Sequence, residues 1–241
     1  MYELSSLQLW DDGSDPEAVS SLTTNLSVLD LQAVSFHAAL ELIAYSNELV
    51  ETARTSRGQA TDDQTRDNLR ERGKTFAEWK MIACRDAAMT VFHFGKALES
   101  ISFKELPAFR EYVDFDLLRK ARRQFETDFP EIEKFRNSIA HSGENASKSE
   151  RPLFDKGIAE PGFTVPAGSS IAMQGTLVGD QITSTAFHPH TKEVLLLSVA
   201  VNADALNKLL AIKTMVLQAF LPLQKALRDN MRQALLGKAH S

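Results

Sequence analysis

Cysteine, tyrosine and tryptophan are scarce in this chain of 241 residues, which holds one Cys, three Tyr and two Trp. The lone Cys84 excludes an intrachain disulfide framework and is typical of a protein from a reducing compartment. Residues 1–15 have neither the basic start nor the apolar stretch of a secretory signal. No apolar run approaches the roughly 18 to 20 residues of a membrane span. We therefore expect a soluble, cytoplasmic protein with no membrane partner.

Acidic residues outnumber basic residues, so the formal net charge is −5. Proteins dedicated to duplex binding are usually basic, so that class is disfavoured. Two segments are nevertheless locally basic, 118–123 and 202–238. They have two interpretations: solvated faces of helices, or a rim that contacts RNA on an otherwise acidic protein.

Apolar residues recur at three- and four-residue steps in three long segments, which predicts helices near 30–53, 75–102 and 203–236. Asp30 is the expected N-cap of the first, and Asn202 that of the last. That helix carries two apolar stripes, which is typical of a helix sandwiched between neighbours. The first stripe is Leu31, Val34, Ala38, Leu42, Tyr45 and Leu49; the second is Leu29, Ala33, Phe36, Leu40, Ile43 and Val50. Pro222 should kink or divide the last helix.

The remaining segments are shorter. Asp116 is expected to begin a helix through Phe125, and Pro130 fits the first turn of the next helix, which Gly143 would end. Runs 170–187 and 192–201 read as antiparallel strands with a turn at Gly179-Asp180.

The predicted fold class is therefore mainly α, an antiparallel helical bundle with a small antiparallel β appendage. We expect one domain, with the bundle at about 26–145 plus 203–238 and a loop and β insertion at about 146–201.

The most informative motif is Phe135-Arg136-Asn137-Ser138-Ile139-Ala140-His141-Ser142-Gly143, at the end of a predicted amphipathic helix. RNA carries its own nucleophile, the 2′-hydroxyl, so a ribonuclease needs a proton carrier and a cation rather than a metal. His141 can act as general base or acid near neutral pH. Arg136 offers a fork of donors that fits phosphate, and Asn137 can orient a partner or bind phosphate.

This motif resembles the Arg-Asn-x-x-x-His signature of the HEPN superfamily, helical proteins that include many metal-independent ribonucleases. The resemblance implies a HEPN-like bundle in which Arg136, Asn137 and His141 are catalytic, with RNA as substrate and no cofactor. It also implies a homodimer whose cleft lies between two motif helices. Such an enzyme would act in a toxin, defence or stress system, with an antitoxin or another protein as partner. The Tyr that follows the His by two residues in one toxin branch is replaced here by Gly143.

The helix geometry permits the same assembly. Five residues turn about 140° around a helix, so Arg136 and His141 of one chain point in different directions. A complete site would then need a second chain.

Two alternatives stand beside catalysis. The chain could be an inactive HEPN-like dimer that binds RNA, a nucleotide or a protein. It could also be a structural helical protein in which His141 stabilises the end of its helix and Arg136 pairs with Glu133 or Asp86.

Two further groups of polar residues stand out. Arg85, Asp86 and His93 lie on the second long helix, where Asp86 could orient Arg136 or His141, although a salt-bridged or solvated face is commoner. His188-x-His190 lacks the further ligand that Zn²⁺ needs, so no metal site is predicted.

Overall fold

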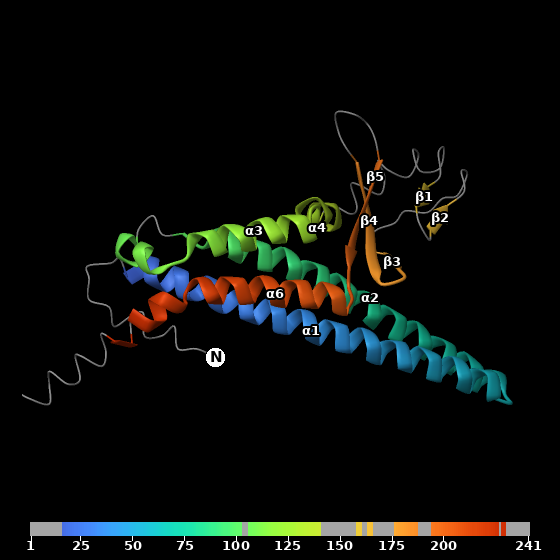
Figure 1. Ribbon diagram of the computed structural model, residues 1–241. Coiled ribbons are helices and arrows are strands. Elements are labelled where there is room, and N and C mark those ends of the chain that lie inside the picture. Colours follow the sequence, from blue (N-terminus) through green and yellow to red (C-terminus); the bar gives the residue numbers. More distant parts are fainter. Residues whose placement is uncertain are drawn as a thin grey trace, which may run out of the picture. The chain divides into compact units, whose positions relative to one another are not determined.

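The computed structural model describes residues 16–102, 106–140, 158–160, 163–165, 176–187, 194–226 and 228–229. It is mainly helical with two small antiparallel sheets, which confirms the coarse fold class (Figure 1). The helices are α1 (Pro16–Gln59), α2 (Asp63–Ser100), the 3-10 helix η2 (Pro107–Tyr112), α3 (Phe115–Asp128), α4 (Ile132–Ala140) and α6 (Ala203–Ala219). The strands are β1 (Ile158–Glu160), β2 (Phe163–Val165), β3 (Thr176–Val178), β4 (Gln181–Phe187) and β5 (Val194–Ala200).

The chain divides into two compact units. The first comprises 1–34, 93–130 and 207–241, and the second comprises 35–92 and 131–206. Helices α1, α2 and α6 each contribute residues to both units. That the two units form a single domain stays a prediction.

Aromatic packing forms the centre of the first unit. The rings of Phe94 on α2 and Phe125 on α3 stack with centroids 5.9 Å apart, and Phe125 also contacts Phe129 at 5.3 Å. The side chain of Asp114 accepts hydrogen bonds from the backbone N–H groups of Asp116 and Leu117 and thereby caps α3, so the helix begins before the expected Asp116. Further buried residues are Leu22, Leu26, Leu29, Leu98, Leu118, Leu209, Ile212, Val216 and Phe220.

A helical hairpin of α1 and α2 forms part of the second unit. A Cβ at Gly73 of α2 would lie 3.8 Å from the Cβ of Ala53 of α1, so the two helices pack directly. The backbone N–H of Thr65 donates to Asp62 Oδ1 over 2.7 Å and caps α2; this bond lowers the pKa of the Asp62 carboxyl. The polar stretch 54–74, which lies between two of the predicted helices, is helical except at residues 60–62.

The sheet of the second unit has the order β3-β4-β5, antiparallel throughout. Gly179, with φ of 62°, forms the tight β3–β4 turn, which confirms the predicted Gly179-Asp180 turn. Helix α4 packs against β4 and β5. The β1–β2 pair lies where we expected only a loop, a correction that follows from pairing between Ile158 and Val165.

The N-terminal helix corrects two expectations. It begins at Pro16, and Asp30 lies within it, where Asp30 Oδ1 accepts a hydrogen bond from Lys213 Nζ over 2.7 Å inside the first unit. The first apolar stripe is not sandwiched, since Leu31, Val34 and Tyr45 expose 55–58% of their surface. By length and composition alone, α1 is also long and apolar enough to cross a membrane, a test that core helices of soluble proteins pass as well.

Helix α2 begins at Asp63, well before the expected residue 75, whereas the last two predicted helices agree better with expectation. Asn202 Oδ1 accepts from the backbone N–H of Ala205 over 2.9 Å and caps α6 as predicted. Helix α6 ends at Ala219 and helical structure resumes at residue 221, so the helix is divided near Pro222, which confirms that prediction. Helix α4 begins at Ile132, and Pro130 lies in the turn before it.

Candidate functional site

Helix α4 carries the first part of the Arg-Asn-x-x-x-His motif. Its inner side buries Ile132, Phe135 and Ser138, at the three-residue steps of a short helical face. Arg136 is half-buried at the edge of that face, and Asn137 is exposed. Since α4 packs on β4 and β5, the sheet fixes which side of the motif helix faces outward.

Arg136 is held by an aromatic ring and an amide rather than by a carboxylate. Its Cζ lies 5.4 Å from the ring centroid of Phe92 on α2, within the second unit, which is a cation–π distance. One of its terminal N–H groups donates to Asn137 Oδ1 over 3.0 Å. Among the described residues no Asp or Glu forms an ion pair with Arg136. Within the described part of the chain, its remaining guanidinium donors are thus not taken up by a carboxylate.

His141 and Gly143, the other two functional positions of the motif, lie outside the described residues. The proposed split of Arg136 and His141 around one helix thus rests on the sequence.

The supporting residues on α2 lie at its surface. Arg85, Asp86 and His93 are all exposed. Asp86 forms no ion pair with Arg136 in the described part of the chain, so the expected Asp86–Arg136 contact is replaced by the contacts of Arg136 with Phe92 and Asn137. The backbone carbonyl of Asp86 accepts a hydrogen bond from Thr90 Oγ1 over 2.8 Å.

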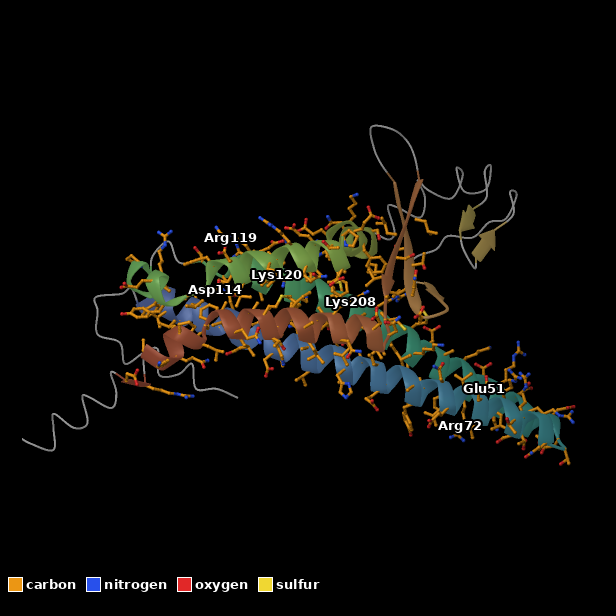
Figure 2. The ribbon with its side chains drawn as sticks, in the orientation of Figure 1. Glu51, Arg72, Asp114, Arg119, Lys120 and Lys208 are labelled. Atoms are coloured by element: carbon orange, nitrogen blue, oxygen red, sulfur yellow. The ribbon has the colours of Figure 1, made fainter. Side chains whose placement is uncertain are left out.

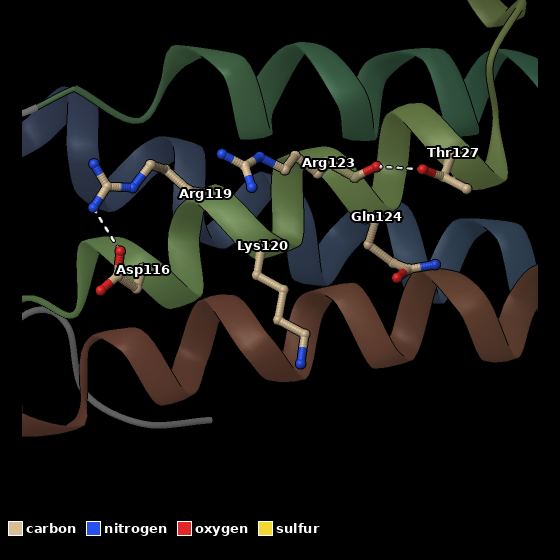
Figure 3. Close-up of a pocket in the computed structure, with 6 residues that line it drawn as sticks. All are labelled: Asp116, Arg119, Lys120, Arg123, Gln124 and Thr127. Atoms are coloured by element: carbon tan, nitrogen blue, oxygen red, sulfur yellow. Dashed lines mark hydrogen bonds and ion pairs between the residues drawn. The ribbon is translucent and has the colours of Figure 1, made fainter.

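A second candidate surface is the cationic face of α3, in the first unit. We use this name for six residues at helical spacing that line a surface depression of about 390 Å³: Asp116, Arg119, Lys120, Arg123, Gln124 and Thr127. Figure 2 shows Arg119 and Lys120 on α3, with Asp114 at its start. Figure 3 shows the guanidinium groups of Arg119 and Arg123 on one side of the helix and the Lys120 ammonium on the other.

The four cations of the 118–123 segment have different roles. Arg119 pairs with Asp116 at 2.6 Å. Arg122 is structural, since its guanidinium donates to the carbonyl of Ile101 over 2.6 Å. Lys120 and Arg123 are exposed and form no ion pair with any described residue. Lys120 and Arg123 are therefore the two cations of this segment left to contact a polyanion, and the RNA-rim interpretation stays a prediction.

Metal and thiol chemistry receive no support from the described residues. They contain no group of three His, Cys, Asp or Glu side chains that could hold a metal ion. His188 and His190 lie outside them. Cys84 is buried, and its burial raises the pKa of the thiol to about 11, so the thiolate is scarce at neutral pH.

Phe92 is the functional candidate that sequence reasoning missed. It reads as one more apolar residue of a core-facing helix, and its role depends on α4 reaching α2 from 44 residues further along the chain. The contact between Phe92 and Arg136 joins residues that are far apart in the sequence. No local sequence signal could therefore have predicted it.

The chain was compared with protein-family models, curated proteins and solved structures, and it matches none of them.

Proposed function

We propose that this protein is a metal-independent endoribonuclease of the HEPN type, with Arg136, Asn137 and His141 as its catalytic residues. The observation that carries the proposal is the set of contacts that Arg136 makes. This residue is half-buried, supported by Phe92 and Asn137, and not neutralised by any carboxylate among the described residues. An arginine held in this way is ready to bind an anionic group.

The chemistry needs only groups that this chain and RNA supply. His141 takes the proton from a ribose 2′-hydroxyl, and the 2′-oxygen attacks the adjacent phosphorus. Arg136 stabilises the negative charge of the phosphorane, which is the step where preorganised donors contribute most. The bond between phosphorus and the 5′-oxygen then breaks, and the 5′-oxygen takes a proton from the protonated His141, so the products are a 2′,3′-cyclic phosphate and a 5′-hydroxyl.

The complete site requires a second copy of the chain in this proposal. Arg136 and His141 are five residues apart, which is about 140° around a helix, so His141 of one copy would serve with Arg136 of the other. A homodimer of this kind, regulated by an antitoxin or another protein, fits a toxin, defence or stress system.

The decisive experiment incubates the purified protein with total RNA, with and without EDTA. We expect cleavage that EDTA does not affect, products that end in 2′,3′-cyclic phosphate, and no cleavage of DNA. His141→Ala should abolish cleavage. Arg136→Ala should lower the rate about 10² to 10³-fold, the usual cost of one lost transition-state donor.

Lys134→Ala is the matched control. Lys134 lies on the same helix, is exposed and pairs with Glu131 at 2.8 Å, so its loss removes a cation without touching the motif. Cleavage that persists in His141→Ala, or that EDTA abolishes, would contradict the proposal. RNA binding without cleavage would instead identify the inactive HEPN-like alternative.

A further inference from the structure

A depression of about 380 Å³ lies in the first unit, where the segment after α2, the 3-10 helix η2 and the start of α3 meet. Three arginines line it, Arg110 from η2 and Arg119 and Arg122 from α3. None of the described residues that line it is acidic. We call it the three-arginine pocket. Its volume is that of a site for a small molecule, and its charge favours an anion.

Contacts within the first unit hold the walls of this pocket in place. The guanidinium group of Arg122 donates a hydrogen bond to the carbonyl oxygen of Ile101 over 2.6 Å, which joins α3 to the segment after α2. The backbone N–H of Asp114 donates to the carbonyl oxygen of Ala219 over 3.0 Å and anchors the junction between η2 and α3. Phe109 fixes η2 to the core, because its side chain is fully buried. The backbone that carries the arginines is therefore in place before a ligand binds.

Two of the three cations have no acidic partner among the described residues. Arg110 is exposed on η2 and Arg122 is half-buried, and neither forms an ion pair with a described residue. Arg119 pairs with Asp116 at 2.6 Å, as Figure 3 shows. Both side chains of that pair are largely exposed, and such a pair contributes little, so Arg119 can also bind another anion. The pocket thus holds two positive charges that no described carboxylate neutralises.

Arg122 also has a buried donor without a partner. Its Nε atom is buried, and no described residue accepts a hydrogen bond from it. Buried donors nearly always have an acceptor, because an unpaired one costs free energy. Since Arg122 lines the pocket, an oxygen of an anion bound there is the acceptor that its guanidinium group needs.

The rest of the wall is apolar. Ile101 and Leu118 are buried, Phe115 is half-buried, and all three line the pocket beside the arginines. Apolar walls with a few placed charges are typical of sites for small ligands. A ligand that fits both parts has an anionic head for the guanidinium groups and an apolar or ring-shaped body for the wall.

We propose that the three-arginine pocket binds a small phosphate monoester, with its phosphate on Arg110, Arg119 and Arg122 and its body against Phe115 and Leu118. A phosphate monoester carries a charge of about −1.5 to −2 at pH 7, which matches the two cations without a partner. A carboxylate or a sulfate ester carries a single charge and leaves one cation uncompensated. The planar guanidinium fork also fits two phosphate oxygens at once. A 5′-phosphorylated RNA end presents the same head group, but its further phosphates extend beyond a pocket of about 380 Å³.

The first test compares three ligands by titration calorimetry of the full chain at constant ionic strength. Phenyl phosphate has the dianionic head and a ring, inorganic phosphate lacks the ring, and phenyl sulfate has the same shape with one charge fewer. Phenyl phosphate should bind about tenfold more tightly than either, because it alone satisfies both the charges and the apolar wall. Equal affinities for phenyl phosphate and phenyl sulfate, or no binding of phenyl phosphate at millimolar concentration, would overturn the proposal.

The second test removes single cations. Arg110→Gln and Arg119→Gln change exposed side chains on two different elements, so the fold should remain intact. Each should weaken binding of phenyl phosphate about tenfold, the usual cost of one charge-assisted hydrogen bond. Arg123→Gln is the matched control, because Arg123 also lies on α3 but lines the cationic face and not this pocket. Arg119 borders both surfaces and Arg110 only the pocket, so Arg110→Gln is the decisive variant. An equal loss in Arg123→Gln would show that net charge alone attracts the ester, and would overturn the pocket.

The pocket lies within the first unit and does not rest on the proposed ribonuclease activity. A protein that binds phenyl phosphate through Arg110 but cuts no RNA would support the pocket and contradict the enzyme. A protein that cuts RNA, and in which Arg110→Gln leaves ester binding unchanged, would support the enzyme and overturn the pocket. Binding of a 5′-phosphorylated oligoribonucleotide through Arg110, without binding of phenyl phosphate, would also overturn the small-ligand proposal and would assign the site to an RNA end.

Discussion

Gly95 of α2 lies directly against Phe125 of α3: a Cβ added at Gly95 would come within 2.5 Å of Cε1 and 2.6 Å of Cζ of that ring. Phe125 cannot retreat easily, because it is packed between Phe94 and Phe129. The close approach of these two helices in the first unit therefore depends on a residue without a side chain.

We predict that Gly95→Ala lowers the free energy of unfolding by about 1 to 3 kcal/mol, the usual cost of forcing extra volume into a packed core. Gly73→Ala is its control. Gly73 also lies inside α2, but its added Cβ would meet only Ala53 Cβ at 3.8 Å, an ordinary contact. There the higher helix propensity of alanine should stabilise the protein by about 0.5 to 1 kcal/mol. Urea unfolding curves of both variants measure the difference, and equal shifts would contradict the packing argument.

Phe92 is expected to be a positioning residue for Arg136. Phe92→Leu should weaken RNA cleavage about two- to fivefold, which corresponds to the roughly 0.5 to 1 kcal/mol of a cation–π contact. Phe92→Tyr keeps an aromatic face and should restore the rate. Single-turnover kinetics of both variants test this, and unfolding curves show whether stability has changed. Equal loss in the Leu and Tyr variants would indicate a packing role only.

The cationic face of α3 should contribute to the salt dependence of RNA binding. Lys120→Glu/Arg123→Glu removes the two cations of this face that form no ion pair with a described residue. The slope of log Kd against log salt should then fall by about 1.4, because each phosphate contact on a single strand contributes about 0.7. Arg72→Glu/Lys74→Glu makes the same change in net charge on the part of α2 that belongs to the second unit. If both double variants alter the slope equally, net charge and not this face controls binding.

Cys84 should be protected from alkylation in the folded protein. At pH 8 a thiol with a pKa of about 11 is almost entirely protonated, and it is also buried. Iodoacetamide should label it slowly in buffer and fully in urea, which mass spectrometry can count. Rapid labelling of the native protein would show that this part of α2 opens readily.

The same pKa makes stability depend on pH. The folded thiol ionises near pH 11 and the unfolded thiol near 9.0, so the folded state binds more protons between these values. The free energy of unfolding should therefore fall as pH rises from about 9 to about 11. Cys84→Ala should lose this part of the dependence, which a comparison of urea midpoints at pH 8 and pH 10 would measure.

Structural features that depend on residues close together in the chain could be predicted from the sequence. The turn at Gly179-Asp180 and the cap at Asn202 depend on one positive φ or one hydrogen bond to a residue three positions away. Features that depend on residues far apart in the chain could not be predicted in this way. Asp30 resembles a cap in sequence, but its partner Lys213 is 183 residues away.

The candidate site follows the same rule. Arg136 and Asn137 were identified from their spacing, since a motif is a local pattern. Their support by Phe92 depends on the packing of α4 in the second unit, which no local pattern specifies. The exposed stripe of α1 shows the limit most clearly, because periodicity predicts an apolar face without stating what covers it.

The turn between β3 and β4 is hydrogen-bonded to the residues that directly precede helix α6. The backbone carbonyl of Asp180 accepts a hydrogen bond from the N–H of Val201 over 2.8 Å, and its carboxylate accepts one from the side chain of Asn202. Asn202 in turn caps α6. A shortened chain in which a linker replaces residues 146–201 would start α6 without this anchor. Deletion is therefore a poor way to ask what the strands do, and point changes on their outer face are the better route.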